Sequence, residues 1–136
     1  MIRPIMRDPL FLSQKSEPAT RADLPVLQDL LDTLQANRER CVGMAANMIG
    51  IKKRIIVFYA GPLCMGMINP AIVSKSGPYE TEEGCLSLDG QRKTTRYQTI
   101  EVAWLDASFQ PRKMTYTGWT AQIIQHEIDH CDGVLI

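Results

Sequence analysis

The order of predicted elements indicates an α+β fold, because a helix, several strands and a final helix follow one another along the chain. Leucines recur at helical spacing near the start, β-branched and aromatic residues dominate the middle, and a glycine follows the last helical stretch. We therefore expect the final helix to pack on an antiparallel sheet. The length of 136 residues predicts one domain, residues 1–136.

Irregular structure is expected over residues 1–20, which contain three prolines. A helix is predicted over residues 21–40, where Thr20 and Asp23 resemble a capping box at its start. Four leucines mark its apolar face: Leu24, Leu27, Leu31 and Leu34.

Strands are predicted in the middle of the chain from β-branched, aromatic and alternating residues, at 54–59, 67–75, 79–83, 99–105 and 113–117. Asn69-Pro70 interrupts the second of these, and a turn at 106–111 joins the last two into a hairpin. A second helix is predicted over residues 119–131, with Gly133 at its C-terminal cap.

The charge balance and cysteine usage exclude several classes of protein. Fifteen Lys and Arg offset fifteen Asp and Glu, so no basic excess is present for direct nucleic-acid binding. The first residues lack the apolar core of a signal peptide, and glycines and prolines break the longest uncharged run. We therefore expect a cytoplasmic protein without a membrane span. The four cysteines form no C-x-x-C pair, which argues against a zinc ribbon or a thioredoxin-like site.

The chemistry is carried by residues 126–130, which match H-E-x-x-H. His126 and His130, spaced i and i+4, project from one helix face and can bind the same divalent ion. Glu127 beside them is the candidate base that activates water. These are the only two histidines in the chain.

A helical wheel places both histidines on the apolar side of this helix, with Trp119 and Ile123. The opposite arc is expected to face water and contains Gln122, Gln125, Asp129 and Asp132. A buried carboxylate at Glu127 would be costly without a nearby cation, which favours a metal over a pair of ordinary core histidines.

Two histidines leave a tetrahedral site short of one protein ligand if one position stays open for water. Asp, Glu and Cys are all candidates for the third. Cys85 follows Gly84 in a tight segment between predicted strands, although a lone cysteine is more often an inert core residue.

Three segments, taken together in this order, resemble the motifs of the peptide deformylase family: residues 43–50, 83–87 and 125–130. The resemblance covers roughly residues 20–136. It implies a peptide deformylase-like fold, with antiparallel sheets around a central metal-binding helix, and removal of the formyl group from N-terminal formylmethionine of nascent polypeptides. It also implies Cys85, His126 and His130 as metal ligands, with Glu127 as the catalytic base. The implied ion is Fe²⁺ in the cell, with Zn²⁺, Ni²⁺ or Co²⁺ as alternatives.

The same resemblance implies further roles. The backbone N–H of Leu86, together with a glutamine side chain, stabilises the charge that develops on the formyl oxygen. Substrate contacts are implied at Val42, Gly43, Gly84, Leu86, Arg92 and Ile123, and Glu83 is expected beside the metal, paired with Arg96. Formylmethionyl nascent peptides are the implied partners, met close to the ribosome.

The sequence departs from the family at Met48, which occupies the position of that catalytic glutamine. Methionine cannot donate a hydrogen bond, and losing one such donor costs about 3–4 kcal/mol. Asn47 could substitute only if the loop shifts, and Cys41 replaces the first glycine of the motif. Alternative functions therefore stay open: a divergent metal amidohydrolase on another formyl or acyl substrate, a non-catalytic formyl-peptide-binding relative, or a zinc endopeptidase.

Overall fold

The computed structural model describes residues 1–85 and 87–135. Its elements are α1 (Pro9–Leu12), a 3₁₀ turn (Arg21–Asp23), α2 (Leu24–Ala36), β1 (Gly43–Ala45), a second 3₁₀ turn (Ala46–Ile49), β2 (Ile55–Ala60), β3 (Leu63–Cys85), β4 (Leu88–Leu105), β5 (Pro111–Thr117) and α3 (Gly118–Cys131). No helix of the described part of the chain is long and apolar enough to cross a membrane.

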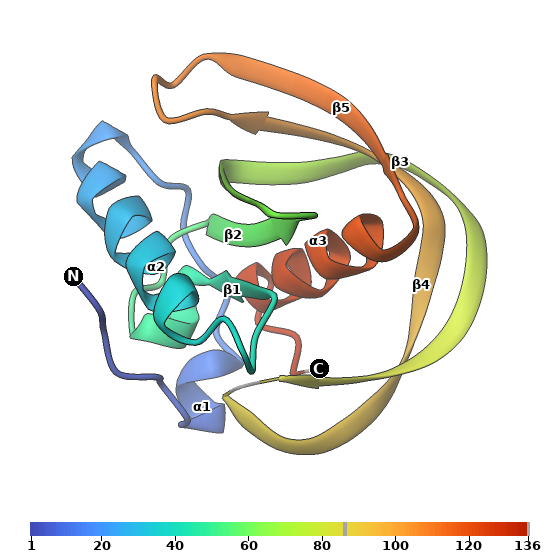
Figure 1. Ribbon diagram of the computed structural model, residues 1–136, viewed down its shortest axis with the longest axis horizontal. Coiled ribbons are helices and arrows are strands. Elements are labelled where there is room, and N and C mark those ends of the chain that lie inside the picture. Colours follow the sequence, from blue (N-terminus) through green and yellow to red (C-terminus); the bar gives the residue numbers. More distant parts are fainter. Residues whose placement is uncertain (86, 136) are drawn as a thin grey trace.

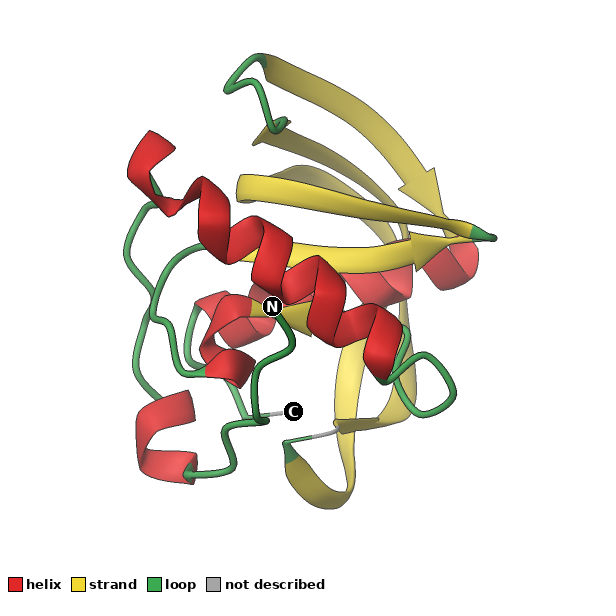
Figure 2. Ribbon diagram, turned by 60° about the vertical axis from the view of Figure 1, so that its left-hand side comes forward, coloured by secondary structure: helices red, strands yellow, loops and turns green. Residues whose placement is uncertain are grey.

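The strands form one antiparallel sheet in the order β1-β2-β3-β4-β5, so each strand pairs with the next along the chain. The long strands β3 and β4 curve around α3, which lies inside the bend (Figure 1). Figure 2 shows α2 on one side of the strands and α3 on the other. This confirms the α+β class and the central position of the C-terminal helix.

Strand β2 contributes side chains to two hydrophobic cores, one on each face of the sheet. Its residues alternate between the faces, so Ile56 and Phe58 pack in the core on the α3 side, while Ile55 and Val57 pack in the core on the α2 side. Such burial on both faces requires a nearly continuous apolar run. The predicted strand at 54–59 is therefore the middle layer of the protein.

The predicted strands at 67–75 and 79–83 are wrong as separate elements, because both belong to the single strand β3. A register shift between Ile68 and Ala71 accommodates Asn69, whose φ of 51° is left-handed. The Asn69 side chain bonds to both the N–H and the C=O of Ala19. The interruption at Asn69-Pro70 is thus a bulge that bends the strand and does not end it.

Helix α2 is shorter than the predicted 21–40. Residues 21–23 form a 3₁₀ turn, where the Asp23 carboxylate accepts a hydrogen bond from the Thr20 N–H at 2.8 Å. At the other end, the Asn37 side chain bonds to the carbonyl of Thr33, four residues back, and the helix stops at Ala36.

Helix α3 matches its prediction within one residue, and Gly133 follows it with a φ of 76°. Two side chains on it have the opposite exposure to that predicted. Trp119 is 62% exposed although it was placed on the apolar arc, and Gln125 is only 4% exposed although it was placed in water. Gln125 bonds to both the N–H and the C=O of Tyr97, because the curved β4 covers this side of the helix.

Candidate metal centre

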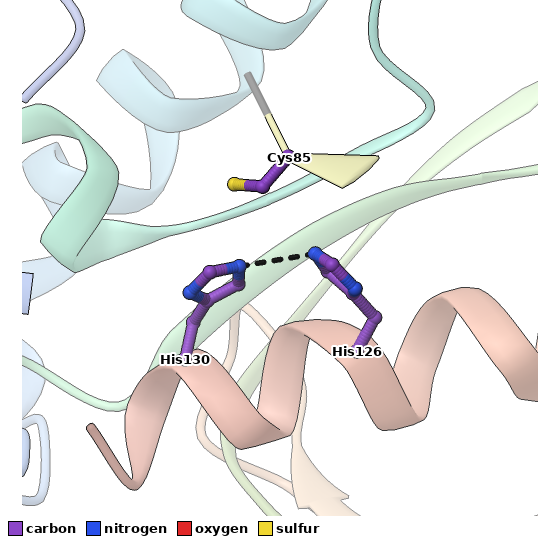
Figure 3. A group of neighbouring side chains, drawn as sticks. All are labelled: Cys85, His126 and His130. Carbon is purple, nitrogen blue, oxygen red and sulfur yellow. Dashed lines mark hydrogen bonds between the residues drawn. The ribbon is translucent and has the colours of Figure 1, made fainter. Parts of the chain in front are cut away.

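Three potential ligands meet where β3 ends against α3. Cys85 is the last residue of β3, and His126 and His130 lie one turn apart on α3. Their ligand atoms, one sulfur and two ring nitrogens, all lie within 4.8 Å of one another. Figure 3 shows the three side chains converging on one point. The residues alone left the third ligand open, and the fold brings Cys85 to the two histidines.

The histidine pair fits a cation chemically. The Nε2 atoms face each other at 3.0 Å, and Nδ1 of His126 lies 2.8 Å from Oε1 of Glu83. Two facing Nε2 atoms need a proton between them, and a cation can replace it. Burial opposes charge on both rings. The carboxylates of Glu127 and Glu83 nevertheless raise the pKa of His126, whereas burial and the charge of His126 lower the pKa of His130.

Glu83 fixes the orientation of the His126 ring. Its carboxylate accepts hydrogen bonds from Arg96 Nη2 at 2.6 Å and from Gln122 Nε2 at 2.9 Å, in addition to the one from His126. Burial opposes its ionisation, but these three donors prevail and lower the pKa of Glu83 to about 2. The predicted pairing of Glu83 with Arg96 is confirmed. A carboxylate behind a ligating imidazole sets its tautomer and leaves Nε2 free for a metal.

The hydrogen-bond network behind His126 also includes Asp129, which the helical wheel placed on the arc that faces water. Its carboxylate accepts a hydrogen bond from Arg96 Nη1 at 2.6 Å. Arg96 is 3% exposed and lies on β4, so it joins two carboxylates that are far apart in the sequence. Gln122 was also assigned to water, but it is half-buried against Glu83. The wheel gave no signal for either contact, because Glu83 lies on β3 and Arg96 on β4, and both contacts depend on how these strands curve over α3.

Glu127 lies beside the ligands with its carboxylate buried. The residue is 4% exposed, and its Oε1 has no hydrogen-bond partner among the described residues. Burial raises the pKa of Glu127 to about 7, with the charge of His126 acting in the opposite direction. A carboxylate that titrates near neutrality is suited to take and return a proton. Strand β1 comes so close that a Cβ on Gly43 would lie 3.0 Å from Glu127 Oε2.

A cavity of about 680 Å³ opens beside this centre. Four of the predicted substrate contacts line it, namely Val42, Gly43, Gly84 and Ile123. Trp119 and Leu88 line it as well. The cavity is bounded by the turn end of the β3–β4 pair, by β1 with the segment before it, and by one face of α3. This places a space for a side chain next to the candidate ligands.

Met48 and Asn47 occupy different environments. Met48 is 1% exposed, lines the cavity, and its Sδ accepts from the N–H of Ala45 at 3.5 Å. The Asn47 Nδ2 donates to the carbonyl of His130 at 2.9 Å, which commits this amide to holding the C-terminal end of α3. The structure therefore gives no support to Asn47 as a replacement for the missing glutamine.

Two further predicted residues are not placed at the centre. Leu86, predicted to supply a backbone N–H, lies outside the described residues. Arg92 is half-buried on β4 and donates to the carbonyl of Asp89 at 3.3 Å. It is not among the described residues that line the cavity, so its contact with a peptide stays a prediction.

Comparison with known proteins assigns the family. A sequence model of polypeptide deformylase matches residues 2–136. The chain is 62% identical to a peptide deformylase of Clostridium beijerinckii over 100% of both chains. It is 41% identical to a peptide deformylase of Pelotomaculum thermopropionicum, over 82% of this chain and 72% of that one.

Solved structures agree with this family assignment. A class I type b peptide deformylase of Acinetobacter baumannii with Met-Ala-Ser bound has a TM-score of 0.87 at 29% identity, covering 99% of this chain and 97% of that one. The enzyme of Thermotoga maritima has a TM-score of 0.88 at 27% identity, covering 99% and 95%. The chain therefore belongs to the polypeptide deformylase family, the metal-dependent hydrolases that remove the N-formyl group from nascent polypeptides.

Proposed function

We propose that this chain deformylates formylmethionyl peptides at a centre held by Cys85, His126 and His130. The observation that carries the proposal is the convergence of their three ligand atoms within 4.8 Å, from two segments far apart in the sequence. Thiolate and imidazole ligands suit borderline-soft divalent ions, and we propose Fe²⁺ in the cell, with Zn²⁺, Ni²⁺ and Co²⁺ also accepted. When bound, such an ion supplies Lewis acidity, which acidifies water and polarises the formyl carbonyl.

Glu127 is the proposed general base and acid. Glu127 lines the cavity and its Oε1 has no hydrogen-bond partner among the described residues, so its carboxylate can accept a proton from the attacking water. The same carboxyl group then returns the proton to the leaving amine nitrogen as the C–N bond of the formamide breaks. Burial raises the pKa of this carboxyl group, which favours its uptake of the proton.

The peptide is proposed to bind along the edge of the sheet. Strand β1 is an edge strand, so its outer backbone groups can pair with an added strand at Val42 and Gly43, opposite Gly84. The methionine side chain then enters the cavity beside Ile123, which is 4% exposed. Arg92 is proposed to contact the peptide farther from the formyl group.

Charge development on the formyl oxygen requires donors. The backbone N–H of Leu86 is the proposed donor from this chain. Met48 lines the cavity where the family has a glutamine, and its thioether accepts but cannot donate. This observation supports a second candidate function, hydrolysis of another formyl or acyl amide, and it predicts slow turnover of formylmethionyl peptides by the natural chain.

The proposed setting is the cytoplasm, where residues 1–136 act as one catalytic domain on chains emerging from the ribosome. The formal net charge of zero supports a peptide and not a nucleic acid as the direct partner.

The decisive experiment is formate release from formyl-Met-Ala-Ser by protein loaded with Fe²⁺ without oxygen. We expect release by the natural chain and none by Glu127→Gln, which keeps the side-chain shape and the metal ligands but cannot accept the proton. Metal analysis of both proteins is the control. Full metal content without any release by the natural chain rejects the proposal in favour of a binding role or of another amide substrate.

A further inference from the structure

One wall of the cavity carries an amide where an apolar group would be ordinary. On α3, Trp119 and Ile123 line the cavity together with Gln122 between them. Burying an amide beside an apolar side chain is costly unless its polar atoms are bonded. Gln122 meets this condition through two contacts, one to Glu83 and one to Tyr79.

The two contacts connect Gln122 to the metal centre. Its Nε2 donates to Oε2 of Glu83 at 2.9 Å, and its Oε1 accepts from the Tyr79 hydroxyl at 3.3 Å. The other oxygen of Glu83, Oε1, lies 2.8 Å from Nδ1 of His126. Gln122 thus borders the cavity on one side and, through a single carboxylate, touches a candidate metal ligand on the other.

Filling the cavity with an apolar side chain changes the surroundings of the hydrogen bond between Gln122 and Glu83. In an empty cavity, water competes for the Gln122 amide, which still has one N–H free. A methionine side chain excludes that water, and the lower local dielectric strengthens the bond to Glu83. Glu83 and the ring of His126 are then held more firmly in one orientation.

We propose that Gln122 is a positioning residue that couples occupancy of the side-chain cavity to the metal ligand His126. On the proposed function, a substrate whose first side chain fills the cavity is then hydrolysed faster as well as bound more tightly. Gln122 acts through Glu83 and is not itself a catalytic residue.

The test uses Gln122→Met, which keeps the length of the side chain and removes the donor. The matched control is Gln28→Met, because Gln28 also donates from a helix to a carboxylate at 2.9 Å, that of Asp32, at an exposed site outside the lining of the cavity. Each protein is loaded with Co²⁺, and its visible absorption is recorded at saturation with the unformylated peptides Met-Ala-Ser and Ala-Ala-Ser. This readout requires no turnover.

We expect the two peptides to give different Co²⁺ spectra in the natural chain and in Gln28→Met, and the same spectrum in Gln122→Met. In the kinetic arm, the ratio of kcat for formyl-Met-Ala-Ser to that for formyl-Ala-Ala-Ser should fall at least about threefold in Gln122→Met, with a smaller change in the ratio of KM. An unchanged spectral difference in Gln122→Met overturns the inference, as does its equal loss in Gln28→Met.

If Gln122→Met does not fold, Tyr79→Phe replaces it. This change frees Oε1 of Gln122 without altering the cavity lining, and a reduced spectral difference is expected, whereas an unchanged one overturns the inference. Absence of formate release by the natural chain rejects the proposed function alone, because the Co²⁺ spectra decide the coupling independently.

Discussion

Replacing Met48 by glutamine should restore a hydrogen-bond donor that the reaction needs. Met48 is 1% exposed and lines the cavity, and its sulfur accepts from the Ala45 N–H at 3.5 Å. A glutamine has nearly the same length. Its Oε1 can accept from the same N–H and form a better bond than sulfur does, which leaves the Nε2 group to face the cavity.

The size of the effect follows from what one such donor contributes. Removing a single oxyanion donor from a hydrolase costs about 3–4 kcal/mol, or about 10² to 10³ in kcat, so Met48→Gln should raise kcat by up to that factor. KM should change little, because the new bond forms with charge that exists only in the transition state. Placing an amide whose two N–H bonds have no protein partner at this site should lower the free energy of unfolding by about 1–2 kcal/mol.

Formate release from formyl-Met-Ala-Ser, at matched metal content, measures this prediction. Met48→Leu is the control, because it removes the sulfur without adding a donor and should give no gain. A kcat gain below about tenfold for Met48→Gln, with metal and fold intact, would refute the reasoning. It would favour the alternative that the natural chain acts on another formyl or acyl amide.

Three further predictions concern the surrounding residues. Gly43→Ala should reduce kcat at least tenfold, on the order of what one misplaced catalytic group costs, because the added Cβ would lie 2.8 Å from Ile123 Cγ2 and 3.0 Å from Glu127 Oε2. An unchanged kcat would show that these two side chains can shift without moving the base from its working position. Arg96→Met should lower the free energy of unfolding of the metal-free protein by about 3–5 kcal/mol, because it leaves Glu83 buried without its main cation. Urea titrations measure this change, and a loss below about 1 kcal/mol would contradict the prediction. Burial, aided by the charge of Glu127, raises the pKa of Cys41 to about 12. The rate at which iodoacetamide alkylates Cys41 should therefore still rise about tenfold per pH unit above about pH 9. A rate that reaches a plateau near about pH 9 would argue against burial of this thiol.

The metal helix could be predicted from the chain alone because its signal is local. His126 and His130 are spaced i and i+4, which places two imidazoles on one face of any helix that forms there. Gly133 was identified as the cap for a similar reason, since the chain must turn with a positive φ directly after the helix. The strand at 54–59 and the hairpin at 113–117 also follow from residue type and turn position.

Other features depend on what lies opposite each face, which periodicity does not report. Gln125 appeared polar and therefore exposed, but β4 curves over it and supplies both of its backbone partners. Trp119 appeared apolar and therefore buried, but it lies at the mouth of the cavity with 62% of its surface exposed. A helical wheel records the order of side chains around an axis and contains no information about the neighbouring elements.

By itself, then, the sequence determined that two histidines and a glutamate share one helix, and that this helix follows a set of antiparallel strands. Only the tertiary structure decided that Cys85 meets those histidines, and that Arg96 and Gln122 reach the carboxylate behind one of them. The physical reason is that contacts within a helix are set by backbone geometry over a few residues. Contacts between β3, β4 and α3 depend instead on how a bulge and a curved sheet return distant segments to the same place.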